Sequence, residues 1–377
     1  MPAARPSSPA CRAKTPKRPR DAVTGVSPDG AQIAHINLAR EFRGGERQTQ
    51  LLMEQLAARG WRQRLVARTS SELADRMNDL ALNGADVVRV GQSPIAWARA
   101  TRSVRITHAH EARAVYVGLV GHWFNGTQGV ITRRVPHPMK PSWLRDRAYR
   151  AAGAIATASD AIAASVHARY ADLATTTIHS AHAEMPVNHG NARAIRDRYA
   201  GKFLIGHTGS YIQKVKGQMT LVDVARRADA EGLDWHFLLM GAGEDEAVFR
   251  EAIGPLTNVE LTGFVDNVGD YLAACDLFAF PSRIEGLGSS LLDALQFGLP
   301  VVATRVGGIP ELIEDGVNGI LVDPDAPDQV YAGIRRLAAG GPDVDRMREA
   351  NRGKSGMFGA AAMADAYEAI YRRLLGE

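Results

Sequence analysis

Short β-rich runs alternate with helical segments along most of this 377-residue chain. In the first half the strand-like runs are "AQIAHINLA", "QRLVAR", "ADVVRV", "RITHAHE" and "GVITRR". In the second half they are "KFLIGHTGS", "HFLLMGAGE", "VELTGF", "LFAFPS" and "PVVATRV". A strand, a helix and a second strand in succession build a parallel sheet with helices on its faces. The alternation therefore predicts an α/β protein with two doubly wound, Rossmann-like domains.

The length of the chain also favours two domains, because single hydrophobic cores rarely exceed about 250–300 residues. A polar segment with weak apolar periodicity, "MPVNHGNARAIRDRYAG", separates the two alternating series. We predict one domain over residues 31–190 and a second over residues 200–358. The helical residues 359–377 lack a strand partner and are expected to pack back on the first domain.

The first 30 residues differ from the rest in composition. The first twenty contain six basic residues, five prolines and no acid. Such a segment buries too little apolar surface to fold, so we predict a disordered tail over residues 1–30. The alternative is a basic arm that binds anionic lipid or nucleic acid. The tail has no apolar h-region and is not expected to be a secretory signal.

Composition narrows the classes of protein that remain. No apolar run approaches the roughly 18 residues that span a bilayer, so any membrane contact is expected to be peripheral. Cys11 and Cys275 lie far apart and predict neither a disulfide framework nor a zinc site. We therefore expect a cytoplasmic protein without a metal or cofactor. The net charge is only +4 and no nucleic-acid reading module is recognisable, so nucleic acid is not the expected partner.

The second domain carries the richest set of polar residues at a strand end. "LFAFPSRIEGLGSSLLDALQFG" places Glu285 in the loop after a strand and Asp293 on the helix that follows. In open parallel sheets, ligands bind beyond the carboxyl ends of the strands. Ser289 or Ser290 can cap this helix, and free N–H groups at its start suit a phosphate. The spacing of the two acids alone fits an ordinary capped helix equally well.

Further features follow strands in the same way. Lys216 follows the first strand of the second domain and offers an ammonium group to a diphosphate. In the first domain, Gly44 and Gly45 open the first helix. Arg133 and Arg134 follow "VIT", where either guanidinium can pair with a phosphate or carboxylate.

Two histidines also end a strand of the first domain. His108 and His110 lie in "THAHEAR", and strand alternation would send them to opposite faces of the sheet. At most one of them is then expected to face a ligand.

The order of these motifs resembles glycosyltransferase family 4, a family of retaining nucleotide-sugar enzymes with the two-domain GT-B fold. The similarity runs from "GSYIQKVKG" through "LLMGAGED" to "GVNGILVDP". The first half resembles the family more loosely, through "FRGGERQ" and "THAHEARA". That pattern is similar to bacterial enzymes that build lipopolysaccharide or related surface glycans.

The resemblance implies roles for individual residues. Glu285 and Asp293 match the ends of the E-x7-E signature, where the first acid lies by the donor sugar and the second binds the ribose hydroxyls. Lys216 matches the diphosphate-binding lysine, and His110 matches the histidine that contacts the donor sugar. The other implied donor-binding positions are Gly44, Gly45, Ser210, Val265, Gly286, Leu287, Gly288 and Ser289.

The chain departs from the family pattern at two positions. Asp293 stands where the signature ends in glutamate, and is shorter by one methylene. Ser210 stands where the family usually has an arginine, although Lys214 can replace that cation. Both departures bear on the affinity for the donor.

The resemblance implies a metal-independent retaining glycosyltransferase of hexosyl or heptosyl type. It would move a sugar from a nucleotide-diphosphate sugar to a glycan or lipid-linked acceptor by front-face substitution. One alternative is a GT-B sugar-nucleotide epimerase, which turns over its donor without an acceptor. Another is a non-catalytic sugar-binding protein with two Rossmann-like lobes.

Overall fold

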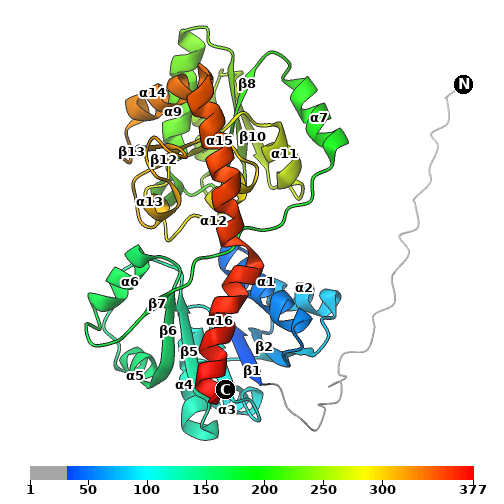
Figure 1. Cartoon of the computed structure of the whole chain (residues 1–377), viewed down its shortest axis with the longest axis vertical. Helices are drawn as coiled ribbons and strands as arrows, with labels where there is room; N and C mark the ends of the chain where they lie inside the picture. Colours follow the sequence, from blue (N-terminus) through cyan, green and yellow to red (C-terminus); the bar gives the residue numbers. More distant parts are fainter. Residues whose placement is uncertain (1–31) are drawn as a thin grey trace, which may run out of the picture. The chain divides into compact units, whose positions relative to one another are not determined.

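The computed structural model describes residues 32–377, and the predicted basic tail (1–30) lies outside the described residues. The described residues belong to one compact unit. Within that unit two parallel sheets carry helices on both faces (Figure 1). The predicted fold class, α/β with two doubly wound parallel sheets, is confirmed.

In the part of the chain that the structure describes, the first sheet has seven parallel strands in the order β3-β2-β1-β4-β5-β6-β7. Their bounds are β1 (Ile33–Asn37), β2 (Gln63–Arg68), β3 (Ala85–Val90), β4 (Ile106–Ala109), β5 (Gln128–Arg133), β6 (Ala152–Thr157) and β7 (Thr176–Thr177). The second sheet has six described strands, all parallel, in the order β10-β9-β8-β11-β12-β13. Their bounds are β8 (Phe203–Thr208), β9 (Trp235–Met240), β10 (Val259–Gly263), β11 (Leu277–Phe280), β12 (Val301–Thr304) and β13 (Ile320–Val322).

Helices connect these strands as the alternation predicts. The helices around the first sheet are α1 (Gly44–Ala58), α2 (Glu72–Leu80), α3 (Pro94–Ala100), α4 (Ala114–Asn125), α5 (Trp143–Ala151) and α6 (Asp160–His167). Those that follow are α7 (His189–Arg198), α8 (Gln213–Lys216), α9 (Met219–Ala230), α10 (Glu246–Ile253), α11 (Val268–Ala274), α12 (Ser289–Gln296) and α13 (Ile309–Leu312). The last are α14 (Pro327–Ala338), α15 (Pro342–Ser355), the 3-10 turn η1 (Gly356–Phe358) and α16 (Ala360–Leu375).

The core lies on both faces of each sheet, because neighbouring strand residues point to opposite sides. In β8, Leu204 packs in the cluster on one face and Ile205 in the cluster on the other. Leu238 and Leu239 of β9 divide in the same way. Strands buried on both faces read as continuous apolar runs, which is the pattern that the sequence displays.

The strand order reverses once in each sheet, between β1 and β4 and between β8 and β11. Loops that leave neighbouring strands at such a reversal diverge, and the space at their carboxyl ends is where open sheets bind ligands. The chain leaves β1 toward Gly44 and leaves β4 toward His110. It leaves β8 toward Lys216 and leaves β11 toward Glu285. The residues that the sequence singles out therefore lie in loops that leave the strands on either side of each reversal.

Two helices join distant parts of the chain. The helix α16 packs against α1 and the first sheet, where Tyr367 and Tyr371 share a core cluster with Ile33 and Leu52. The helix α7, which begins at the end of the first predicted domain and runs through the segment between the two, packs on α11 of the second half. Among residues 32–377 no helix has both the length and the apolar character needed to cross a bilayer.

Candidate functional site

Glu285 and Lys216 form an ion pair at the carboxyl ends of β11 and β8. Lys216 Nζ donates to Glu285 Oε2 at 2.6 Å. The Lys216 side chain is only 18% exposed and the Glu285 side chain only 15%. The strands β8 and β11 are neighbours in the second sheet, so their loops emerge side by side. The N–H groups of Arg283 and Ile284 both donate to the carbonyl of Val215, which fixes one loop against the other. The sheet thus brings together two residues far apart in the sequence.

Further contacts orient the Glu285 carboxylate. Ser282 Oγ donates to Oε2 at 3.4 Å, and the N–H of Gly286 donates to Oε1 at 3.3 Å. Lys216 Nζ also lies 5.5 Å from the centre of the Phe280 ring, within the range of a cation–π contact. The ammonium group is therefore held between an acid and an aromatic face.

The helix α12 begins differently from the prediction. Its N-cap is Gly288, with φ +100°, and Ser289 is already the first helical residue, so capping by Ser289 or Ser290 was wrong. A φ in this left-handed region favours glycine, which is the physical reason for the residue type. Within residues 32–377 no side chain caps α12, so its first N–H groups have no side-chain acceptor.

The glycines of both domains mark close approaches. A Cβ on Gly44 would lie 3.1 Å from Ser289 Oγ, so the start of α1 meets the start of α12. A Cβ on Gly286 would lie 2.3 Å from the carbonyl oxygen of Arg134. Gly45, by contrast, faces open space. The loop that contains Glu285 is thus packed against first-domain backbone.

Asp293 lies on α12 and contacts the segment that connects the two sheets. Its Oδ1 accepts a hydrogen bond from the N–H of Ala183 at 2.9 Å. Burial raises the pKa of Asp293 to about 6, opposed by that hydrogen bond and by the charge of Arg47. Arg47 is a residue that the sequence reasoning missed. Its only signal is a cation in "GGERQ", one turn after the glycine pair.

Asp293→Asn is expected to stabilise the protein at neutral pH. The folded-state pKa lies above the reference value of 3.8, so the folded state binds this proton more tightly than the unfolded chain. The contribution of Asp293 to the free energy of unfolding therefore falls as pH rises from about 4 to about 6. Above about pH 6 the full destabilisation by the buried carboxylate is present. Asparagine keeps an oxygen for Ala183 without the charge. With allowance for partial exposure, we expect a gain on the order of 1–2 kcal/mol near pH 7.5 and almost none near pH 4.

Urea denaturation of the wild type and the Asp293→Asn variant at both pH values measures this difference. Asp266→Asn, at an exposed aspartate, is the matched control and should change neither value. A variant that is less stable than the wild type near pH 7.5 would show that Arg47 stabilises the carboxylate more than burial penalises it.

The two histidines do not lie as predicted. The ring centres of His108 and His110 are 3.8 Å apart, so placing them on opposite faces was wrong. Residues two apart along a strand point to the same face, so His110, one residue past the end of β4, lies on the side of His108. His110 Nε2 lies 3.0 Å from Nδ1 of His35, a third buried histidine that the sequence reasoning missed.

Arg133, the last residue of β5, and Arg134, which follows it, contact different partners. Arg134 Nη1 donates to the carbonyl of His110 at 3.2 Å and lies 3.4 Å from His110 Nδ1. Arg133 Nη2 instead donates to the carbonyl of His137, within its own loop. Of the two, Arg134 is the one that contacts both His110 and the Glu285 loop.

The remaining predicted donor-binding residues lie around the second sheet. Val265 follows β10 and packs against the core, while its neighbour Phe264 is 73% exposed. The carbonyl of Ser210 accepts from Gln218 Nε2 at 2.8 Å. Leu287 is buried, and Lys214 is exposed on α8. These positions remain predictions about the donor.

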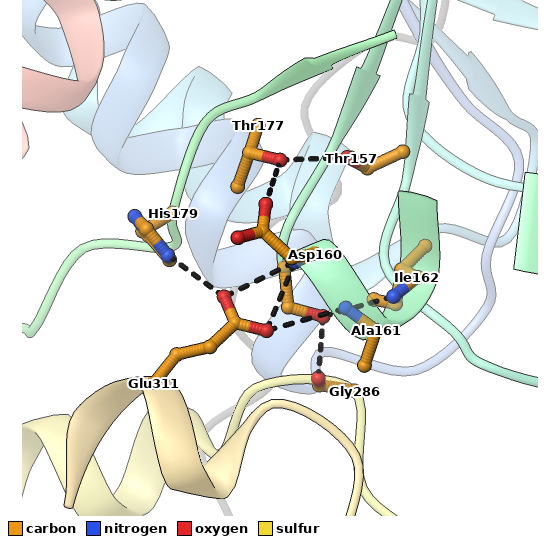
Figure 2. Close-up of polar contacts among 9 residues, drawn as sticks. Thr157, Asp160, Ala161, Ile162, Thr177, His179, Gly286 and Glu311 are labelled. Carbon is orange, nitrogen blue, oxygen red and sulfur yellow. Dashed lines mark hydrogen bonds and ion pairs between the residues drawn. The ribbon is translucent and has the colours of Figure 1, made fainter. Parts of the chain in front are cut away.

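Contacts between the two halves of the unit converge on Glu311 of α13, another residue missed from sequence (Figure 2). Its carboxylate accepts from the N–H of Asp160 at 2.9 Å and from the N–H of Ala161 at 3.2 Å. It also lies 3.1 Å from His179 Nε2. Beside it, Ser159 Oγ donates to the carbonyl of Gly286 at 2.8 Å. A carboxylate from the second half thus caps α6 of the first half, where a negative charge is stabilised by the helix dipole.

Glu311→Ala is expected to speed amide exchange at Asp160 and Ala161 about tenfold, since these N–H groups lose a charged acceptor worth about 1–2 kcal/mol. Hydrogen exchange followed by mass spectrometry on peptides that cover the start of α6 measures the change. Glu314→Ala removes an exposed acid just after α13 and should leave amide exchange at Asp160 and Ala161 unaltered. Equal exchange in both variants would mean that Glu311 does not hold the two halves together.

Comparison with known proteins finds relatives of part of this chain among glycosyltransferases. Residues 202–339 match the family described as "Glycosyl transferases group 1". D-inositol 3-phosphate glycosyltransferase of Segniliparus rotundus is 32% identical over 175 residues, which cover 44% of this chain and 38% of that protein. The lipopolysaccharide core biosynthesis glycosyltransferase LpsE of Rhizobium meliloti is 31% identical over 181 residues, which cover 46% of this chain and 51% of that protein. The match therefore spans about half or less of the length of these curated relatives.

Solved structures extend the likeness to nearly the whole chain. Anabaena Alr3699/HepE in complex with UDP-glucose superposes with a TM-score of 0.77, covering 92% of this chain and 99% of that one. At 19% identity this likeness shows the fold. Residues 202–339 thus match the group 1 glycosyltransferase family, and the whole chain has the two-sheet GT-B fold.

Proposed function

We propose that this protein is a retaining glycosyltransferase that moves a sugar from a nucleotide-diphosphate sugar to a glycan or lipid-linked acceptor. The observation that carries the proposal is the Glu285–Lys216 pair at the strand reversal of the second sheet, close to the uncapped start of α12. The group 1 family match over the same half supports it.

The donor would bind by exchanging partners within this pair. Lys216 would turn from Glu285 to the diphosphate, whose charge the first N–H groups of α12 also stabilise. Asp293 would accept hydrogen bonds from the ribose hydroxyls. The proposal assigns the diphosphate charge to these groups of the chain and gives no role to a divalent ion.

Transfer would proceed on one face of the sugar. The bond between the anomeric carbon and the phosphate oxygen breaks, and a bond from that carbon to the acceptor oxygen forms on the same side. The acceptor proton passes to the departing phosphate oxygen, so charge balances without a covalent enzyme intermediate. Glu285 and His110 would lie by the sugar, where preorganised polar groups stabilise the developing charge.

The acceptor would lie on the side of the first domain. A cavity of about 370 Å³ beside α1 supports this, since it has a largely polar lining that suits hydroxyl groups. Its lining comprises Phe42, Arg47, Gln50, Leu51, Glu54, Gln55, Arg76, Glu184 and Ala360. The likeness to the lipopolysaccharide enzyme LpsE supports a surface glycan as the product.

Thermal-shift measurements with UDP-, GDP- and ADP-sugars test the donor. The structural likeness to a protein complexed with UDP-glucose leads us to expect the largest rise in melting temperature with a UDP-sugar. Absence of a shift with every nucleotide sugar, together with a shift from free sugars, would instead favour a sugar-binding protein.

Product analysis separates a transferase from an epimerase. We expect the donor to be consumed at an appreciable rate only when an acceptor is present, and the anomeric configuration to be retained in the product. Interconversion of the donor sugar without any acceptor would favour the epimerase.

A lipid-linked acceptor would place the protein in the cytoplasm, at the inner face of the cytoplasmic membrane. Contact would then be peripheral. Co-sedimentation with vesicles that contain anionic lipid, compared with neutral vesicles, measures this contact, and equal recovery in the supernatant would count against it.

A further inference from the structure

A buried network of imidazoles and hydroxyls lies behind His110. His35 comes from β1, His108 from β4, and the tyrosines Tyr367 and Tyr371 from α16. All are buried, and one ring nitrogen from each of His35, His108 and His110 lies within 4.8 Å of the other two. Desolvation lowers the pKa of each imidazole, so all three rings are neutral near pH 7. A neutral imidazole has one donor and one acceptor nitrogen, and its neighbours decide which is which.

The direction of the protons can be followed from Arg134. A guanidinium only donates, so His110 Nδ1, 3.4 Å from Arg134 Nη1, is the acceptor of that ring. His110 Nε2 must then carry the proton and donate to His35 Nδ1 at 3.0 Å. His35 Nε2 then carries the next proton; among the described residues neither this nitrogen nor Gln63 Oε1 has a hydrogen-bond partner, although the nearby Gln63 side chain opposes the lowering of the His35 pKa. Arg134 thereby sets the tautomers of two histidines in succession.

The C-terminal helix holds the third histidine from both sides. His108 Nδ1 lies 2.6 Å from the hydroxyl of Tyr371, and its Nε2 lies 2.6 Å from Thr132 Oγ1. Thr132 in turn lies 2.8 Å from the hydroxyl of Tyr367. The His108 ring packs on His110 with centres 3.8 Å apart, so its position limits that of His110. A helix more than two hundred residues away in the sequence thus supports the ring next to the Glu285 loop.

Three clustered histidines also suit a metal ion, and the contacts distinguish the two arrangements. A ligand nitrogen must offer its lone pair to the metal. Both nitrogens of His110 are occupied by Arg134 and His35, and both nitrogens of His108 by Tyr371 and Thr132. A metal would have to displace several of these short contacts. The geometry therefore favours a hydrogen-bonded network.

We propose that Arg134 and His35 hold His110 in a single tautomer, with Nδ1 as the acceptor toward Arg134, and that Tyr371 and His108 are positioning residues that keep the His110 ring in place. Arg134 links the ring to the Glu285 loop, because its guanidinium contacts His110 while its backbone carbonyl lies against Gly286. The network therefore fixes the orientation of the His110 ring beside Arg134. This inference rests on the proposed contact of His110 with the donor sugar.

Long-range proton–nitrogen NMR on protein labelled with 15N-histidine reports the tautomers directly. Signals are assigned by single histidine-to-glutamine variants. In the wild type we expect His110 to show a protonated Nε2 and an unprotonated Nδ1, with no minor form. A mixture of tautomers, or a stoichiometric transition metal in the purified protein, would overturn the proposal.

Tyr371→Phe removes one hydroxyl and keeps the ring that packs in the core. Because His108 loses a partner and its ring restrains that of His110, we expect a shifted or split His110 signal and a kcat about tenfold lower, while the donor KM stays within about twofold. Tyr331→Phe is the matched control, since it also removes a hydroxyl that donates to an acceptor, Glu231, but on α14 of the other half. It should leave both the His110 signal and kcat unchanged.

An unaltered kcat in Tyr371→Phe, or an equal loss in Tyr331→Phe, would refute the positioning role. The tautomer measurement needs no substrate. It therefore keeps its meaning if the proposed sugar transfer fails, and the two failures can be told apart.

Discussion

Glu285→Gln is expected to lower the rate of sugar transfer about 10²–10³-fold while the protein stays folded. Glutamine keeps the shape of the side chain and can still accept from Gly286, but it removes the negative charge that faces Lys216 at 2.6 Å. The loop is also held by the N–H groups of Arg283 and Ile284, which the substitution does not touch. The substitution should therefore lower the rate of sugar transfer without unfolding the protein.

Release of nucleoside diphosphate in the presence of acceptor measures the rate, and far-UV circular dichroism checks the fold. Glu244→Gln is the matched control, because Glu244 is an exposed acid in the loop after the neighbouring strand β9. The control should transfer sugar normally. Near-normal transfer by the Glu285 variant itself would remove that residue from the active site.

Lys216→Met is expected to lower kcat/KM for the donor at least about 100-fold, because the diphosphate loses its proposed cation. The variant should also be less stable by about 1–3 kcal/mol, since it leaves the largely buried Glu285 carboxylate without its partner. Methionine retains most of the apolar stem but removes the ammonium that lies over the Phe280 ring.

The double variant Lys216→Met, Glu285→Gln separates these two effects. It should recover much of the lost stability but none of the activity, because removing both charges relieves the unpaired acid. Lys214→Met, at an exposed lysine of the same short helix, serves as the control and also tests whether Lys214 replaces the arginine that Ser210 lacks. A large loss of donor affinity in the Lys214 variant would transfer the phosphate role to that residue.

Local pattern was sufficient for the fold class. Alternating apolar runs and helical segments depend on neighbours within about ten residues, and the structure confirms two parallel sheets. The same local reasoning was wrong where one residue changes the geometry. The N-cap of α12 is Gly288 rather than Ser289 or Ser290. Element ends are decided by single φ angles and hydrogen bonds, which periodicity does not report.

The residues missed from the sequence share a physical cause. Arg47 and Glu311 are ordinary charged residues on helices, with no spacing that marks them. Arg47 gains its importance from the charge of Asp293, and Glu311 from the N–H groups at the start of α6. Those partners lie more than a hundred residues away along the chain. Only the packing of one half on the other makes the contacts.

The sequence by itself determined the two-sheet α/β class and the strand ends at which Lys216 and Glu285 stand, because both follow from short-range apolar periodicity. The tertiary structure alone decided which of these groups touch. It paired Lys216 with Glu285, placed Asp293 against the backbone of Ala183, and placed Tyr371 against His108. Hydrogen bonds and desolvation act over a few ångströms in space, whereas sequence patterns report only neighbours along the chain.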